Sequence, residues 1–549
     1  MTDVSSVLPL AAVAVPTLAI VCIYAARTRP NLREASTLAA AVATLGVVWA
    51  MTRVAGSETH VSTLGSIAGI EFALRADAAG LLFALLAAIL WLVTSVYSIG
   101  YVRALGEHAQ TRYFAAFAAS IAATMGVAFA ANLFTLFVSY ELLTLATYPL
   151  VVHKESAEAR AAGRTYVAYT LGGGVLVFAG IVIVGALTGT VAFDAGGIAG
   201  LGGADPTLAR VAFALLVVGF GVKTAIVPLH GWLPTAMVAP TPVSGLLHAV
   251  AVVKSGVFAL SRTVLYVFGP ETTWDLGVGL PLAVAAAATM VVAGIVGLRQ
   301  DNLKRGLAYS TISQLSYIAL GIAIATPVAV FGAFLHVVAH AFMKITLFFA
   351  AGVVYVETGE KYVSDIAGVG RRLPATMTAF AIAAAGLVGF PFVAGFVSKF
   401  YLVLGTGDSV HPWLVAAYLV AGLLKLLYFW PVIYAAFFGE RGSADDASRH
   451  PFAPAHATDG GFSSLDIEDA SYGDATDGGV ATSDGVAAGA AGAYARSMTW
   501  ERRTLTTETS PALLVPVLVT VGFAVALGLV PTAFPFWALA EAVVTEVFG

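Results

Sequence analysis

Lysine, histidine and glutamate side chains occur inside long apolar segments of this sequence, where ionisable groups are rare. A charged side chain at the centre of a bilayer costs about 2.5–3.5 kcal/mol on insertion scales. Several such groups in one chain therefore indicate a function, and the chemistry that they share is the uptake and release of protons. The groups are Glu141, Lys223, His248, Lys254, His336, His340, Lys344, Lys399 and Lys425.

Three of these residues, His336, His340 and Lys344, recur at intervals of four. On a helix this spacing places the side chains on one face, about 6 Å apart along the axis. The row predicts a path for proton transfer. Metal binding by the two histidines is the alternative, but it requires a nearby carboxylate or a third ligand, and the sequence has no H-E-x-x-H motif. No metal site is therefore expected.

Glu141 is the one acidic residue that falls deep inside a predicted span. Pairing it with Lys223 would keep both groups charged, whereas separation would favour the neutral forms because burial disfavours charge. A Glu–Lys pair whose side chains can separate and meet again would therefore switch between neutral and charged forms. The alternative is structural, since a buried Lys–Glu pair can simply hold two helices together. Asp77, at the start of its predicted span, fits either a helix cap or a functional carboxylate.

Helix-breaking residues lie beside two of the lysines. Broken spans are tolerated at membrane depth where the freed backbone groups line a wet cavity or pack within protein, so both breaks indicate an ion path. Each half of the chain thus has an interrupted span that carries a lysine, which is typical of an internal structural repeat. The breakers are Pro228, Pro234, Pro240 and Pro242 after Lys223, and Gly389, Pro391 and Gly395 before Lys399.

The composition places these groups in a membrane protein. Of the 549 residues, 59% are apolar and 11% are charged, and the mean hydropathy is +0.88, whereas soluble domains average about 25% charged residues. The 28 Lys and Arg residues form no basic stripe, which excludes nucleic-acid binding. The single cysteine, Cys22, excludes a disulfide framework and any Cys-ligated metal or iron–sulfur site within the chain. No cofactor is expected.

Long unbroken apolar runs predict an all-α membrane protein of about fourteen transmembrane helices and not a barrel. The first run lacks a preceding basic region, so we expect a retained span and not a cleaved signal peptide. The predicted spans are 6–26, 36–54, 78–100, 113–131, 132–152, 166–189, 207–227, 241–265, 276–298, 306–326, 328–355, 375–404, 411–439 and 511–532.

The loops between these spans predict the orientation. Nineteen Lys and Arg residues fall in odd-numbered loops, and four fall in even-numbered loops: Arg53, Arg75, Arg210 and Arg262. Because cytoplasmic loops retain positive charge, both termini are expected outside the cell membrane. The segment 440–508 is poor in large apolar residues and is expected to be a flexible acidic cytoplasmic loop. Its acidity fits either a high-salt cytoplasm or an ordinary disordered linker.

Six motifs resemble those of the antiporter-like, proton-conducting membrane subunits shared by respiratory complex I, membrane-bound hydrogenases and Mrp-type multisubunit cation/proton antiporters. One departure is Thr235, which stands where the family has an aspartate after W-L-P. The motifs are the YELLTLATYPLV segment at Glu141, K-x-A-x-x-P-x-H-x-W-L-P at Lys223–Pro234, A-P-T-P-V-S with L-L-H at Ala239–His248, K-R-x-L-A-Y-S-x-I-S-Q at Lys304–Gln314, H-x-x-x-H-A-x-x-K at His336–Lys344, and G-x-P-x-x-x-G-F-x-x-K at Gly389–Lys399.

This resemblance implies two inverted five-helix repeats with broken helices, at 113–265 and 276–439, each containing a half-channel. They would be preceded by three helices at 1–112 and followed by the loop at 440–508 and a last helix and tail at 509–549. The implied roles are a charge pair for Glu141 and Lys223, a bridge between channels for Lys254 with His248, a relay for His336, His340 and Lys344, and a terminal lysine for Lys399.

The sequence WLPTAMVAPTPVSGLLHAVAVVKSGVF is most similar to D-type subunits of Mrp antiporters. We therefore expect a proton-translocating subunit of a multisubunit Na⁺/H⁺ antiporter, with other membrane subunits as partners. The alternatives are a pump subunit of complex I or a membrane-bound hydrogenase, and a structural subunit whose buried charges serve assembly. The chain has no P-loop, no G-x-G-x-x-G in a strand–helix context and no catalytic triad signature, so no enzymatic site is expected.

Overall fold

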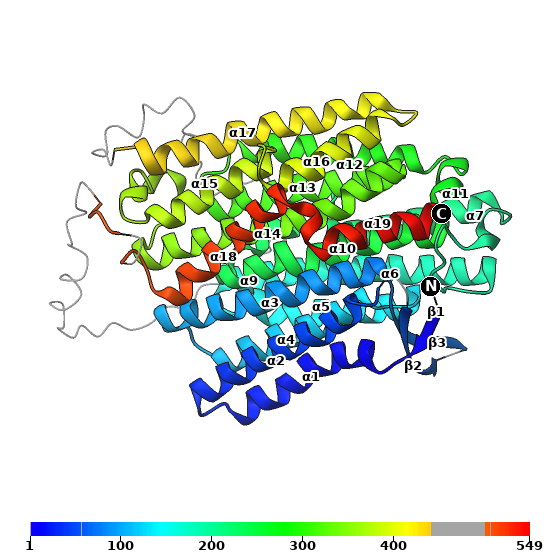
Figure 1. Cartoon of the computed structure of the whole chain (residues 1–549), viewed down its shortest axis with the longest axis horizontal. Helices are drawn as coiled ribbons and strands as arrows, with labels where there is room; N and C mark the ends of the chain where they lie inside the picture. The colour runs from blue at the N-terminus through cyan, green and yellow to red at the C-terminus, as the bar shows by residue number, and fades with distance from the viewer. Residues whose placement is uncertain (1, 56–57, 68, 441–499, 505–506) are drawn as a thin grey trace, which may run out of the picture.

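The molecule is a bundle of long helices whose axes are roughly aligned with one another (Figure 1). The computed structural model describes residues 2–55, 58–67, 69–440, 500–504 and 507–549. Both termini lie at the same end of the bundle, beside a small sheet (Figure 1). The prediction of a flexible acidic loop at 440–508 falls mostly on residues 441–499, which lie outside the described residues.

The N-terminal part begins with short strands and continues into the first long helices. The strands form one sheet in the order β1-β2-β3, in which β1 pairs parallel with β2 and β2 pairs antiparallel with β3. The elements are β1 (Thr2–Ser5), α1 (Leu8–Ala25), α2 (Pro30–Thr52), β2 (Glu58–Ile67), β3 (Ile70–Ala76), α3 (Ala78–Ala104), α4 (Gln110–Ala128), α5 (Leu133–Val151) and α6 (Ala157–Thr188).

The rest of the chain contains several helices that are interrupted within the bundle. The elements are α7 (Pro206–Thr224), α8 (Trp232–Thr235), α9 (Thr241–Gly245), the π-helical turn η3 (Leu246–Val250), α10 (Val252–Arg262), the π-helical turn η4 (Thr263–Phe268), α11 (Pro270–Asp275), α12 (Gly279–Gly297), α13 (Leu303–Ile324), α14 (Pro327–Thr358), α15 (Pro374–Val388), α16 (Ala394–Gly407), α17 (Val415–Phe438), α18 (Pro511–Leu529) and α19 (Pro535–Phe548), together with short 3₁₀ turns.

Most of the predicted spans are confirmed. Twelve helical segments among the described residues are long and apolar enough to cross a membrane. The other two predicted spans, at 113–131 and 375–404, correspond to α4 and to the broken pair α15 and α16. The structure adds α19 and the three-stranded sheet, which the sequence analysis did not anticipate. Both breaks are present, because α7 ends at Thr224 before a non-helical stretch and α15 ends at Val388 before α16 begins.

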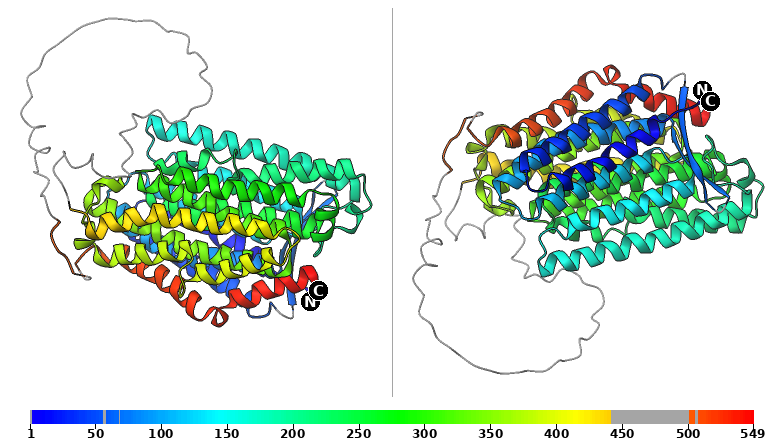
Figure 2. Two further views of the ribbon diagram at one scale, coloured as in Figure 1. Left: turned by 90° about the horizontal axis from the view of Figure 1, so that it is seen from above. Right: turned by 90° about the horizontal axis from the view of Figure 1, so that it is seen from below.

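The candidate relay residues lie on the most deeply buried helices. The apolar windows of α14 and of the continuous segment from α9 to η4 are buried throughout, and that of α13 is almost entirely buried. Helix α14 packs against α13, α15, α16 and α18. By contrast, α6 lies at one edge of the bundle in Figure 2, with Val175 and Val182 exposed. A helix enclosed by other helices can carry polar groups without placing them in lipid.

Candidate functional site

Glu141 on α5 and Lys223 on α7 form the first group of the site. Lys223 is fully buried in the last turn of α7, where the helix dipole favours a cation. Its ammonium donates to the carbonyl of Tyr140 and lies 3.4 Å from the centre of the Tyr140 ring. Glu141 is half-buried, and its Oε1 has no hydrogen-bond partner among the described residues. The Lys223 ammonium thus contacts Tyr140, the residue before Glu141, and no ion pair between Glu141 and Lys223 is present among the described contacts.

Two adjacent glycines of α6 shape the surroundings of Glu141. A Cβ on Gly174 would lie 2.5 Å from Oε1 of Glu141, so the missing side chain makes room for the carboxylate. A Cβ on Gly173 would lie 2.9 Å from the carbonyl oxygen of Gly219 on α7, so the missing side chain permits close packing of α6 against α7. A Cβ on Gly172 would meet nothing within 4 Å.

Lys254 on α10 contacts the histidine row of α14 directly. Its ammonium donates to Nδ1 of His340 at 2.8 Å, and both residues are fully buried. The rings of His340 and His336 are stacked with centroids 6.3 Å apart, which matches the predicted step along one helical face. The predicted row is thus present and is joined to the first half of the chain through Lys254.

His336 is held between α13 and α16. Its Nε2 donates to the side-chain oxygen of Gln314 at 2.7 Å, and its Nδ1 is 2.8 Å from the hydroxyl of Ser398. A neutral ring accepts a hydrogen bond from Ser398 at Nδ1, whereas a protonated ring donates to the same oxygen. In the second case the Ser398 hydroxyl is free to donate to the carbonyl of Ala394, which is 3.2 Å away. Ser398 can therefore respond to the protonation of His336.

The break between α15 and α16 supplies the next contact. The last carbonyl groups of a helix have no intrahelical partner, and here those of Leu387 and Val388 accept hydrogen bonds from the Lys399 ammonium. Gln314 donates to the same Leu387 carbonyl at 2.8 Å. His336, Gln314 and Lys399 are therefore connected through one backbone oxygen, and this connection depends on the broken helix.

Lys344 and Lys425 complete the set of buried lysines. The Lys344 ammonium donates to Ser310 Oγ and to the carbonyl of Leu307, both on α13. Lys425 on α17 lies 3.9 Å from the centre of the Tyr317 ring, and its ammonium has no hydrogen-bond partner among the described residues. The same ring also contacts Lys399, at 4.7 Å. Neither ammonium group has an ion-pair partner among the described contacts. The Tyr317 ring stabilises both of them by cation–π interactions.

His248 is separate from this series. It lies in the π-helical turn η3, packs against the ring of Phe348 at 4.9 Å, and has no hydrogen-bond partner at either ring nitrogen among the described residues. The structure thus brings Lys254 to His340 and not to His248. A π-turn in an otherwise regular helix frequently marks a functional position, and the sequence carries no signal for it.

Asp77 is both a helix cap and half of an ion pair. Its side chain accepts from the backbone N–H of Gly80 at the start of α3 and pairs with Arg262 at 2.5 Å. Arg262 is buried within the continuous segment from α10 to η4, so its assignment to a loop in the sequence analysis is wrong. When Arg262 is assigned to the helix, three basic residues remain in the even-numbered loops.

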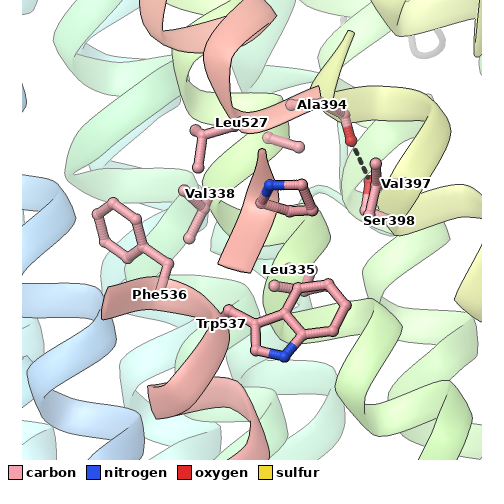
Figure 3. Close-up of a pocket in the computed structure, with 10 residues that line it drawn as sticks. Leu335, Val338, Ala394, Val397, Ser398, Leu527, Phe536 and Trp537 are labelled. Carbon is pink, nitrogen blue, oxygen red and sulfur yellow. Dashed lines mark hydrogen bonds between the residues drawn. The ribbon is translucent and has the colours of Figure 1, made fainter. Parts of the chain in front are cut away.

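One small pocket lies beside Ser398, between α14, α16 and the C-terminal helices (Figure 3). Its volume is about 20 Å³, which is enough for one water molecule. Most of the lining residues are apolar, and the Trp537 indole N–H already donates to Glu541. A water needs two to four polar partners, so this pocket is a packing gap beside the relay and not a ligand site.

Several residues of the site escaped the sequence analysis. Gln314 ends a recognised motif, and a glutamine in an apolar span is a usable signal. Ser310, Ser398 and Tyr317 carry no such signal, because hydroxyl side chains are common in membrane helices and usually bond to their own helix. The carbonyl of Leu387 has no signature at all, since it becomes an acceptor only through the break in the helix.

The fold and the site define a class: a multi-span membrane protein with buried, hydrogen-bonded ionisable groups beside broken helices. The family model "NADH:quinone oxidoreductase/Mrp antiporter, TM" matches residues 130–425. The chain belongs to this family of membrane proteins, as the motifs predicted. Its homologues are subunits of multisubunit membrane complexes.

Two curated relatives illustrate the range of the family. The chain is 33% identical over 395 residues to the A/B subunit of a probable K⁺/H⁺ antiporter of Rhizobium meliloti (strain 1021), a match that covers 70% of this chain and 38% of that protein. It is 35% identical over 371 residues to the N subunit of NADH-quinone oxidoreductase of Desulforudis audaxviator (strain MP104C), covering 67% of this chain and 73% of that protein. The match to this chain thus covers well under half of the length of the first relative.

Two solved structures share the fold over nearly the whole chain. A chain of the Mrp complex from Dietzia sp. DQ12-45-1b superposes with a TM-score of 0.79 and 24% identity, covering 99% of this chain and 97% of that one. A chain of the archaeal membrane-bound sulfane sulfur reductase superposes with a TM-score of 0.76 and 21% identity, covering 99% and 98%. At these identities the likeness establishes the fold.

Proposed function

We propose that the chain is a proton-translocating subunit of a multisubunit monovalent cation/proton antiporter, with Na⁺ as the exchanged cation. The observation that carries the proposal is a series of buried polar contacts. Lys254 donates to His340, whose ring stacks on that of His336. Gln314 then links His336 to the Leu387 carbonyl, which also accepts from Lys399. Imidazole accepts a proton at one ring nitrogen and releases one from the other, so a stacked pair can pass protons onward. The family match and the fold shared with an Mrp complex support the antiporter assignment.

The proposed path has two half-channels, at 113–265 and 276–439. Glu141 and Lys223 act as the charge pair of the first, Lys254 connects the two, and His336, His340, Lys344 and Lys399 act in the second. The rings of His336 and His340 are too far apart for a hydrogen bond. A proton crosses this interval by ring reorientation or through one bridging water. His248, which has no polar partner among the described residues, contributes a spare acceptor beside the π-turn.

The decisive experiment replaces the connecting lysine. Lys254→Met removes the charge and keeps an unbranched side chain, and we expect exchange in proteoliposomes of the assembled complex to fall by about 100-fold or more. Exchange is followed with a pH-sensitive dye after an Na⁺ jump and, separately, a K⁺ jump. Lys154→Ala, an exposed lysine after α5, is the matched control. Unchanged exchange in an assembled Lys254→Met complex would assign the buried charges to assembly instead.

A second candidate function is favoured by the NADH-quinone oxidoreductase relative, most of whose length the match covers. In this case the same relay would be part of a redox-driven pump of the complex I or membrane-bound hydrogenase type. Gentle affinity purification from native membranes, with mass spectrometry of the partners and an iron assay, separates the two. Small membrane partners without iron support the antiporter, and iron–sulfur partners support the pump.

We also propose that both termini lie outside the cell membrane. The two termini share one end of the bundle, and after the reassignment of Arg262 the basic residues favour the opposite end more strongly. In a Cys22→Ser background, Gly549→Cys should react with an impermeant maleimide on intact cells, whereas Lys361→Cys should not. The reverse labelling pattern would invert the orientation.

A further inference from the structure

A second group of ionisable residues lies at the opposite end of the bundle from the termini, outside the proposed relay. Glu107 and His108 lie in the loop between α3 and α4, and His153 follows the end of α5. Each of the three residues offers one potential ligand atom, a ring nitrogen or a carboxylate oxygen. These three atoms lie within 4.8 Å of one another. The two histidine rings are stacked with centroids 4.8 Å apart.

His153 is buried without the partners that a buried imidazole needs. Its side chain is 1% exposed, and neither ring nitrogen has a hydrogen-bond partner among the described residues. A buried polar group without a partner is costly and indicates an interaction not yet accounted for. Nε2 is within ion-pair distance of Glu107 when the ring is protonated, but Nδ1 has no polar partner among the described residues in either state.

The geometry fits two ligands of one metal ion. Nε2 of His153 lies 3.6 Å from Oε2 of Glu107, which is too long for a hydrogen bond. Ligands at about 2.0–2.1 Å from a tetrahedral Zn²⁺ are separated by about 3.3–3.4 Å. A small adjustment of either side chain therefore gives the spacing that zinc requires, and the exposed His108 can complete a set of three.

The neighbouring contacts hold this arrangement in place without occupying the ligand atoms. Gln110 donates from Nε2 to the backbone carbonyl of Glu107, and Arg112 donates to that of His153. Arg112 is also paired with Glu155 at 2.6 Å, and this ion pair offsets the positive charge of the guanidinium.

We propose that Glu107, His108 and His153 form a binding site for Zn²⁺. Two imidazoles and a carboxylate are typical zinc ligands, and three protein ligands leave a fourth position open, here on the side where His108 is exposed. Bound zinc would tie the end of α5 to the loop after α3. Glu141 lies on the same helix, about 18 Å from His153 at 1.5 Å per residue. The proposal does not depend on the transport function.

The sequence pattern that suggests metal binding is confined to His336 and His340, which share a helix, and it predicts no metal site. The ligands proposed here come from two separate loops, and no motif spacing connects them. Only the packing of α3, α4 and α5 brings them together.

The test is direct metal binding to the assembled complex. The complex is purified with an affinity tag that contains no histidine, stripped with EDTA, and titrated with Zn²⁺ against a chromophoric chelator. We expect one Zn²⁺ site per chain whose affinity falls at least about tenfold in His108→Ala and in Glu107→Gln. Co²⁺ loading should give a d–d absorption spectrum in the wild type that these variants lose.

Two further variants keep the test decisive. His411→Ala, between α16 and α17, removes a loop histidine that packs against Trp274, and it should leave affinity and spectrum unchanged. His153→Ala should abolish binding, but His108→Ala decides the matter if the buried substitution prevents assembly, because His108 is exposed. Equal Zn²⁺ affinity and identical Co²⁺ spectra in the wild type and His108→Ala would overturn the proposal.

Discussion

The two halves of the bundle arrange their buried ionisable groups in different ways. In the first half a carboxylate, Glu141, follows Tyr140, whose carbonyl accepts from the Lys223 ammonium, and Oε1 of the carboxylate has no hydrogen-bond partner among the described residues. In the second half His340, His336 and Lys399 are bases connected by hydrogen bonds through Gln314 and by one ring stack, and Lys254 joins them from the first half. The first arrangement can change its charge state by moving one side chain, whereas the second depends on continuous contact.

This difference has an electrostatic consequence. Opposite charges stabilise one another, so the first pair can hold two charges in a buried place. Like charges in a poorly screened interior repel, so the bases of the second half cannot all be protonated together. A proton that binds to one of these bases therefore favours release of a proton from the neighbouring base. Substitutions that remove charge therefore test the first half, and substitutions that remove a contact without changing charge test the second.

The largest effect is expected from Glu141→Gln, which removes the charge and preserves the shape. Without the carboxylate, the Lys223 ammonium keeps its contacts with Tyr140 but loses its opposite charge, and the switch is lost. We expect cation/proton exchange in proteoliposomes to fall by about 100-fold or more, the range of a lost acid–base group. Glu158→Gln, an exposed carboxylate at the start of α6, is the control. Near-normal exchange would show that the first half works without its charge pair and would contradict the contrast drawn between the two halves.

A smaller effect is expected from Gly174→Ala, which leaves both charges in place. The new methyl group would lie 2.5 Å from Oε1 of Glu141 and must displace the carboxylate. Overpacking of this kind costs about 1–3 kcal/mol, and we expect exchange to fall about tenfold. Gly172→Ala is a matched control two residues away, because its methyl group would meet nothing within 4 Å. Equal activity of the two variants would show that the position of Glu141 is not critical.

The sequence alone predicts the charged members of both halves but only part of their connection. Lys223, Lys399 and the histidine row are recognisable because charge in an apolar span is costly, and the two helix breaks follow from proline and glycine. The contact of Lys254 with His340 depends on how α10 packs against α14. The acceptor at Leu387 is a backbone atom, so its role follows from the break and not from its side chain.

The same limit applies to the elements at the ends of the bundle. The strands β1 to β3 are short, and β2 and β3 lie between two predicted spans, where apolar windows of about 19 residues do not detect strands. Helix α19 contains 14 residues, fewer than such a window requires. The π-turn at His248 changes only the local hydrogen-bond pattern, which side-chain periodicity does not encode.

In the second half, Gln314→Leu tests connectivity without changing charge. The variant removes the link between Nε2 of His336 and the Leu387 carbonyl, while Lys399 keeps its own contacts with the helix end. A buried donor left without its partner costs about 1–3 kcal/mol, so we expect exchange to fall at least about fivefold. Gln300→Leu, whose amide bonds within the end of α12, should be neutral. Full activity of Gln314→Leu would mean that protons bypass this residue.

The smallest effect is expected from Ser398→Ala, which removes one of the two partners of His336. The ring keeps its hydrogen bond to Gln314, so the cost is that of a single neutral hydrogen bond, about 0.5–1.5 kcal/mol. We expect about a two- to fourfold loss of exchange. Ser316→Ala is the control, because its buried hydroxyl bonds only to its own helix in the described contacts. If Ser398→Ala lost as much activity as Gln314→Leu, the hydroxyl that alternates between His336 and Ala394 would itself be a step of the relay.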